Sequence, residues 1–176
     1  TALTVEIQDA SHFRGEAEEV LSPENEAQIS SLLQAASAKK KPVTISGGGT
    51  GLTGGRVPQG GILLQTDRMN RILQITERTA VVQPGVSLKA LEEALEPRGL
   101  FYPPDPGEKA AFLGGTVSTN ASGPRSLKYG PTRRWVRRLR VVLPQGDVLD
   151  LRRGEQQAHG DSLTLVPPGK QPLKIT

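Results

Sequence analysis

The predicted function of the chain depends on one glycine-rich stretch, Ser46-Gly47-Gly48-Gly49-Thr50-Gly51-Leu52-Thr53-Gly54-Gly55. We name this stretch the glycine loop. Six of its residues are glycine, which tolerates positive φ and lets a ligand approach the backbone closely. Successive backbone N–H groups in such turns form a concave set of donors that can hold a phosphate. Three residues of the loop, Ser46, Thr50 and Thr53, add hydroxyl groups. The sequence therefore predicts an anion-binding nest at this loop.

The same loop matches the pattern G-x-G-x-x-G over Gly49–Gly54, and a short strand is expected before it, over 42–46. Asp67 could serve as the ribose-binding acid of a nucleotide site of the Rossmann type. That site needs a helix to begin at the third glycine, so that the helix N-terminus faces the pyrophosphate. Here residues 56–61 contain a proline and two glycines, which disfavour the first turns of a helix. The next expected element, over 61–66, is a buried strand, so the pattern argues against a Rossmann site.

Two other interpretations of the glycine loop differ in how well the sequence supports them. A Walker loop ends in Gly-Lys-Ser/Thr, and no such triplet occurs in the chain, since Gly169-Lys170 is followed by Gln171. A mobile loop without a ligand stays open, because glycine clusters are common in turns.

Composition excludes several classes of site. The 176 residues include no cysteine, so disulfides, zinc-thiolate sites, cysteine nucleophiles and cysteinyl-linked cofactors are excluded. The two histidines, His12 and His159, lie far apart in polar stretches and predict exposed loop residues, and no metal site is predicted. Thr1–Asp9 alternates like a strand, and no apolar stretch approaches the roughly 18 residues of a membrane span. We predict a cytoplasmic protein, or one held at a membrane through a partner.

Periodicity predicts a mixed α/β chain. Ser22-Pro23 is a helix start, and an apolar stripe follows it, so a helix is expected over 23–39. Ser87 is expected to cap a second helix with a Leu-rich stripe, and Gly99 to end it. The three prolines of 101–107 exclude regular structure there. Three hairpins are expected, over 72–76 with 80–83, 135–143 with 148–151, and 163–166 with 172–175.

A local excess of positive charge surrounds Trp135. The chain carries 22 basic and 18 acidic residues, a net charge of +4, and five arginines fall within 133–140. Arginines beside an aromatic residue can bind nucleic acid. Apolar residues alternate with these arginines, which favours a strand pair with one buried face, so no nucleic-acid partner is predicted. The arginines are expected to face solvent, a neighbouring domain or a partner subunit.

Five segments together resemble the PCMH-type FAD-binding domain of the vanillyl-alcohol oxidase superfamily, and within it the glycolate oxidase / D-lactate dehydrogenase group. Their order and spacing agree with that family over about residues 18–151. The segments are the glycine loop, Val82–Val86, Tyr102–Pro106, Gly114–Gly123, and Tyr129-Gly130 with Val141–Gly146.

The resemblance implies an α+β fold of two lobes in a single domain over 1–176. A small α/β lobe would cover about residues 1–78, and a larger lobe with a mixed or antiparallel sheet and helices about 79–176. FAD would lie between them. The cap or substrate domain of the resembling enzymes is absent from the chain.

The resemblance also implies the site residues. The glycine loop would wrap the pyrophosphate, and Pro104, Asp105 and Pro106 would lie near the isoalloxazine. Flavin and ribityl contacts would come from Gly114, Gly115, Thr116, Ser118, Thr119 and Asn120. Some superfamily members attach FAD through a histidine where this chain has Thr50, so non-covalent FAD is expected.

The implied activity is flavin-dependent oxidation of a small 2-hydroxy acid of the glycolate or D-lactate type. No catalytic residue is assigned, because the substrate base and the carboxylate clamp are expected from a cap domain or partner subunits. Two rivals remain: a non-catalytic fragment or subunit that keeps the fold and binds FAD weakly or not at all, and an NAD dehydrogenase.

Overall fold

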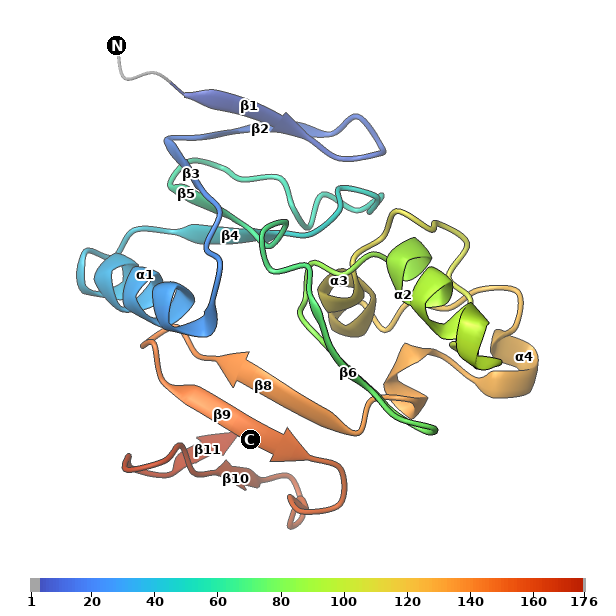
Figure 1. The fold of residues 1–176 in the computed structure, drawn as a ribbon. Coiled ribbons are helices and arrows are strands. Elements are labelled where there is room, and N and C mark those ends of the chain that lie inside the picture. The colour runs from blue at the N-terminus through green and yellow to red at the C-terminus, as the bar shows by residue number, and fades with distance from the viewer. Residues whose placement is uncertain (1–3, 176) are drawn as a thin grey trace. The chain divides into compact units, whose positions relative to one another are not determined.

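The computed structural model describes residues 4–175 and shows a mixed α+β fold with small sheets (Figure 1). The mixed α+β class expected from the sequence is confirmed. The chain forms two compact units. The first contains the chain up to Glu24 together with Lys41–Trp135, and the second contains Asn25–Lys40 together with the chain from Val136 onward.

The first unit contains three small sheets. They are a hairpin of β1 with β2, a parallel sheet in the order β3-β5-β4, and a hairpin of β6 with β7. The strands are β1 (Val5–Gln8), β2 (Arg14–Ala17), β3 (Glu19–Leu21), β4 (Val43–Ser46), β5 (Ile62–Gln65), β6 (Ile72–Ile75) and β7 (Ala80–Val82). The strands expected around residues 43 and 62 and the hairpin around 77 are confirmed.

The middle strand β5 explains why the parallel sheet forms. Its three leading residues, Ile62, Leu63 and Leu64, are all buried, as expected for a parallel strand covered on both faces. On the edge strand β4, Ile45 remains 52% exposed, whereas Ser46 at the end of the same strand is fully buried. The sheet therefore fixes the start of the glycine loop in the core.

Two helices of the first unit, α2 (Leu88–Leu95) and α3 (Leu113–Ser118), contribute to an apolar cluster. The unit also contains the 3-10 turn η1 (Glu96–Arg98), α4 (Ser126–Tyr129) and the 3-10 turn η2 (Thr132–Arg134). Ser87 caps α2 as expected, because its hydroxyl accepts the amide of Ala90 at 3.1 Å. Gly99 ends η1 with φ +65°. The cluster consists of Val86, Leu88, Leu91, Leu95, Ala111 and Leu113.

The second unit contains one helix and two hairpins. These are α1 (Glu26–Ala38), β8 (Arg138–Val142) with β9 (Val148–Arg152), and β10 (Leu163–Leu165) with β11 (Leu173–Ile175). Both hairpins were expected. Helix α1 begins later than predicted, because Asn25 and not Ser22 accepts a first-turn amide, that of Gln28 at 3.0 Å.

Within residues 4–175 no sheet has more than three strands. The division into lobes over about 1–78 and 79–176 stays a prediction. Two of the five clustered arginines are exposed, as expected, and also form ion pairs: Arg138 pairs with Asp150, and Arg140 pairs with both Glu26 and Asp150.

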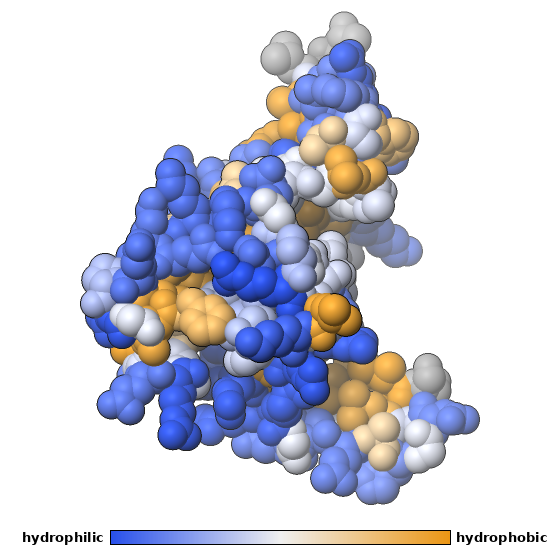
Figure 2. All heavy atoms as spheres, turned by 90° about the vertical axis from the view of Figure 1, so that its right-hand side faces the viewer, coloured by the Kyte–Doolittle hydropathy of each residue, from blue (hydrophilic) through white to orange (hydrophobic). Residues whose placement is uncertain are grey.

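The surface carries scattered apolar residues among charged ones. On the face drawn in Figure 2, hydrophilic residues dominate and hydrophobic residues form separate patches. No helix among the described residues is long and apolar enough to cross a membrane.

Candidate functional site

The glycine loop connects two parallel strands without any helix. After β4 the chain runs through turns until β5 begins at Ile62, which confirms the argument against a Rossmann site. Gly49 and Gly54 have φ angles of +77° and +76°, in the region where only glycine is unstrained. Among the described residues, the amides of residues 47–53 have no hydrogen-bond acceptor, and Gly54 donates to Asp9 at 2.8 Å. The loop therefore presents a run of unused backbone donors.

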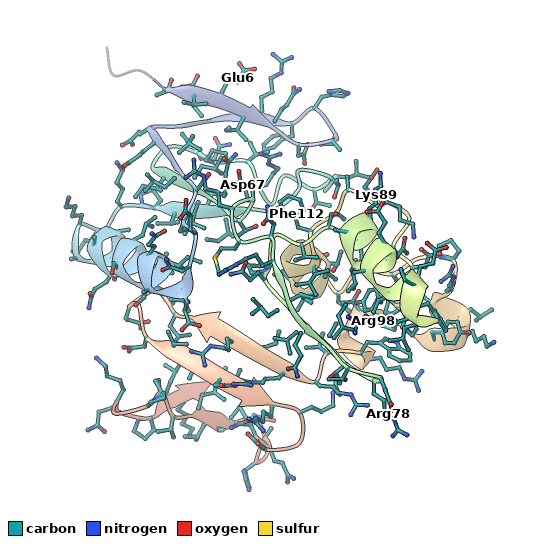
Figure 3. All side chains as sticks on the ribbon, viewed as in Figure 1. Glu6, Asp67, Arg78, Lys89, Arg98 and Phe112 are labelled. Carbon is teal, nitrogen blue, oxygen red and sulfur yellow. The ribbon has the colours of Figure 1, made fainter. Side chains whose placement is uncertain are left out.

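The structure brings the glycine loop against residues 110–115, at the start of α3. A Cβ atom at Gly48 would lie 2.6 Å from the Ala110 carbonyl oxygen, a clash that excludes larger residues. A Cβ atom at Gly47 would lie 3.9 Å from the Cα atom of Gly115 and 3.8 Å from Phe112, which Figure 3 labels beside α3. Two segments far apart in sequence thus meet through glycines.

Helix α3 is held in place by the segment Val82–Val86. The amides of Leu113 and Gly114 donate to the carbonyls of Val86 and Pro84, both at 2.8 Å. A Cβ atom at Gly114 would lie 2.7 Å from Pro84. The next amide, that of Gly115, has no acceptor among the described residues. This free donor belongs to the residue whose Cα atom lies against Gly47.

The segment Tyr102–Pro106, here named the proline loop, meets the far end of the segment Gly114–Gly123. Pro104 is fully buried, and a Cβ atom at Gly123 would lie only 1.6 Å from the Asp105 carbonyl oxygen. The Asp105 carboxylate pairs with Lys109 at 2.7 Å and with Arg125 at 3.3 Å. The hydrogen bond from Lys109 holds the pKa of Asp105 below its ordinary value. Asp105 is therefore ionised and already bound by two cations.

The predicted side-chain contacts of α3 are mostly occupied within the chain. Ser118 and Thr119 donate their hydroxyl protons to the carbonyls of Gly114 and Gly115, at 2.8 and 2.9 Å. Thr116 is 3% exposed and donates to the Leu113 carbonyl. Asn120, with φ +50°, accepts the amide of Arg133 at 3.0 Å. These hydroxyl oxygens remain acceptors only, since each proton is already used.

Arg56 is a residue of this region that sequence reasoning missed. Its Nη1 atom would lie 2.0 Å from a Cβ atom at Gly49, so the guanidinium covers the middle of the glycine loop. Its Nε atom is buried without a hydrogen-bond partner in the described part of the chain. The only feature of the sequence that could have pointed to Arg56 is its position directly after the glycine loop.

The described residues fit a ligand that carries several negatively charged oxygens. The unused amides of 47–53, the amide of Gly115 and the guanidinium of Arg56 are all donors. The Asp9 carboxylate nearby already accepts four hydrogen bonds. The glycines leave room where a Cβ atom would fill the space. A diphosphate matches such a set of donors.

Comparison with known proteins agrees with this chemistry. The sequence model of one family, described as "FAD binding domain", matches residues 17–152. The chain is similar to D-lactate dehydrogenase of Archaeoglobus fulgidus, 42% identical over 75% of this chain and 30% of the relative. It is also similar to glycolate oxidase subunit GlcD of Bacillus subtilis, 45% identical over 74% of this chain and 28% of that subunit.

A solved structure extends the likeness to the fold. An alkyldihydroxyacetonephosphate synthase superposes with a TM-score of 0.69 at 30% identity, covering 77% of this chain and 28% of that one. The chain thus spans less than a third of the length of each of these proteins. Because the family match takes in most of the chain, including every predicted site residue, the chain belongs to the FAD binding domain family, of the PCMH type.

Proposed function

We propose that this chain binds FAD non-covalently as the cofactor-binding part of a flavin-dependent oxidoreductase that oxidises a small 2-hydroxy acid, of the glycolate or D-lactate type. The similarity to a D-lactate dehydrogenase and to a glycolate oxidase subunit supports the substrate class. Because the chain spans about 30% of these relatives, a cap domain or partner subunits would supply the substrate base and the carboxylate clamp. No residue of the chain is assigned to catalysis.

The observation that carries the proposal is the run of unused donors in the glycine loop. Three features suit a diphosphate better than any neutral ligand. They are the unpaired amides over 47–53, the φ angle of +77° at Gly49, and the close contact between Gly47 and Gly115. Backbone dipoles fixed in this way stabilise negative charge without a bulky side chain. Thr50, whose side chain cannot form the histidyl link of some relatives, supports non-covalent binding.

Bound FAD would supply the hydride acceptor for the oxidation. The chain's own residues would bind and orient it. The glycine loop would hold the pyrophosphate, with Ser46 as its buried anchor. Residues of α3 and the proline loop, Pro104, Asp105 and Pro106, are proposed to border the flavin ring. Within α3 the contacts would come from backbone groups and from hydroxyl oxygens acting as acceptors.

The experiment that tests the proposal is an FAD titration of the wild-type chain and of Gly49→Val, followed by calorimetry. A β-branched residue at φ +77° is strained by about 1–3 kcal/mol and would displace Arg56. We expect the FAD dissociation constant to rise at least tenfold, which corresponds to about 1.4 kcal/mol. Circular dichroism should show an unchanged fold.

The matched control is Gly169→Val, which places the same residue at a similar angle, φ +71°, in the turn between β10 and β11. Nothing lies within 4 Å of a Cβ atom there. This variant should bind FAD as the wild type does. Unchanged FAD affinity in Gly49→Val would count against the glycine loop as the diphosphate site.

One rival function has a specific observation in its favour. The chain spans only about 30% of its relatives, so contacts from elsewhere could be needed for tight binding. On that hypothesis the chain is a non-catalytic module that binds FAD weakly or not at all. Absence of thermal stabilisation by excess FAD would favour the module. Stabilisation by NAD in place of FAD would instead support a nicotinamide-dependent enzyme.

A further inference from the structure

The turn of the β1–β2 hairpin, residues 9–13, lies against the glycine loop. The amide of Gly54 donates to the Asp9 carboxylate at 2.8 Å, across 45 positions of sequence. The amide of Ala10 donates to the Gly51 carbonyl at 3.1 Å. A Cβ atom at Gly54 would lie 3.0 Å from the Phe13 ring. Three separate contacts therefore join this hairpin turn to the second half of the loop.

The Asp9 carboxylate is the centre of this junction. It is 5% exposed, and it accepts hydrogen bonds from two groups of Ser11, from the Phe13 amide and from the Gly54 amide. The bond from the Ser11 hydroxyl, together with these amides, lowers the pKa of Asp9 below its ordinary value. A buried, fully bonded carboxylate holds its donors in fixed places, because each would otherwise lose a charge-assisted bond.

The strand that follows the turn fixes the chain beyond the glycine loop. The amide of Glu16 donates to the Pro58 carbonyl at 3.1 Å, and the amide of Gly60 returns a bond to the Glu16 carbonyl at 2.7 Å. A Cβ atom at Gly15 would lie 2.1 Å from the Pro58 oxygen, so β2 packs directly on this stretch. The segment from Gly51 to Gly60 is thus attached to one hairpin at both ends.

We infer that Asp9 is a positioning residue for the cofactor site: the β1–β2 hairpin clamps the glycine loop through Asp9, and so keeps the free amides of 47–53 aimed at one ligand. The inference rests on the proposed binding of FAD by that loop. The clamp residues 9–13 precede the region that the family model matches, 17–152. The clamp therefore belongs to a part of this chain that the family match leaves out. It sets the shape of the loop and contributes no direct contact to the ligand.

Asp9→Ala tests the clamp with two independent measurements. Hydrogen exchange followed by NMR reports on the Gly54 amide without any ligand, and we expect its protection in the wild type and its loss in the variant. FAD titration should show a dissociation constant raised about tenfold, as expected for the loss of a charge-assisted bond that holds the loop. Asp9→Asn, which keeps one acceptor oxygen, should give a smaller change in both measurements and covers the case in which Asp9→Ala does not fold.

The matched control is Glu6→Ala, which removes an exposed carboxylate from β1 of the same hairpin, where it pairs with Arg14 at 3.4 Å. Its Gly54 protection and FAD affinity should stay within about twofold of the wild type, since an exposed ion pair contributes little and the bond between Asp9 and Gly54 remains. Unchanged FAD affinity in an Asp9→Ala variant whose Gly54 amide has lost protection would overturn the positioning role. Unprotected Gly54 in the wild type would overturn the clamp itself. Failure of the wild type to bind FAD would defeat the proposed function instead, and the exchange data would still decide whether Asp9 fixes the loop.

Discussion

The guanidinium of Arg56 completes the donor set of the glycine loop. A buried N–H group without an acceptor costs about 1–3 kcal/mol, and this cost applies to Arg56 Nε as long as no acceptor reaches it. Phosphate oxygens are suitable acceptors, because a guanidinium forms charge-assisted bonds with them. The glycine loop itself, Ser46–Gly55, contains no cationic side chain. Arg56 is thus the residue that would give the site a net positive charge.

We predict that Arg56→Gln raises the FAD dissociation constant about tenfold, since one charge-assisted bond contributes about 1.5–3 kcal/mol. The salt dependence of binding should also weaken, because backbone amides carry no net charge to screen. Titrations at two ionic strengths measure both effects. Arg152→Gln removes the same charge from an exposed pair with Glu155 in the second unit, and it serves as the control. Equal salt dependence in Arg56→Gln and wild type would contradict the assignment.

Single residues of the site differed in how well they could be predicted. The glycine loop could be predicted because its residues are adjacent and its chemistry is local. Asp9 could not, because its partner Gly54 lies 45 positions away and only folding brings the two together. Ser118 and Thr119 were expected to contact the flavin and ribityl groups. In the helix that starts at Leu113, their hydroxyls donate to the carbonyls four residues earlier, those of Gly114 and Gly115, as such side chains commonly do.

At the scale of elements, patterned segments were predictable and short ones were not. Helix α2 has a capping serine and a clear apolar stripe, and it formed as expected. Strand β3 has three residues, too few to show alternation, and it exists because β5 offers an edge for pairing. Helix α3 contains two adjacent glycines, which oppose helix formation by roughly 1 kcal/mol each. Tertiary bonds to Val86 and Pro84 hold it in place instead.

The start of α1 also depends on a contact between residues distant in sequence. Ser22 has the right residue type for a helix cap, but its hydroxyl donates to the Gln65 side chain at 3.3 Å, directly after β3 ends at Leu21. The helix therefore begins three residues later, and Asn25 takes the capping role. Ser22 is thus a residue of the right type for a helix cap at the wrong position. Its hydroxyl bonds to Gln65, a strand residue distant in sequence, and does not cap the helix.

The β8–β9 ladder yields a prediction about pH. Hydrogen bonds from Arg138 lower the pKa of Asp150 to about 2, from an ordinary value of 3.8. A carboxyl group with a lowered pKa stabilises the fold above the unfolded-state value and loses that contribution as the pH falls through the folded-state value. The stabilisation by this ion pair should therefore be complete above about pH 4 and vanish near pH 2.

Urea unfolding of wild type and Asp150→Asn, followed through the hairpin, measures this window. The wild type should be the more stable at pH 7, and the two midpoints should converge between about pH 4 and pH 2. Asp161→Asn, which changes an exposed carboxylate outside the ladder, is the control and should follow the wild type. A gap between wild type and Asp150→Asn that stays constant down to pH 2 would show that the lost bond matters and its charge does not.

At the scale of the whole molecule, the candidate site lies within one of the two compact units. The glycine loop, the proline loop and α3 all fall inside Lys41–Trp135. The division follows contacts and not sequence order, since α1 belongs to the unit that contains the C-terminal hairpins. Periodicity could not predict this, because it describes single elements and carries no information on which of them pack together. A ligand that binds the first unit is therefore expected to stabilise mainly that unit.

We therefore predict that FAD changes amide hydrogen exchange unequally along the chain. A ligand at 100 times its dissociation constant stabilises the state that binds it by about 2.7 kcal/mol. Peptides from β4, β5, α2 and α3 should exchange about a hundredfold more slowly where exchange follows opening of that unit. Peptides from β10 and β11 should change much less, and mass spectrometry with and without FAD can compare them in one sample. Equal slowing in all of these peptides would mean that the two units open together, and that the stability of the second unit also depends on the ligand.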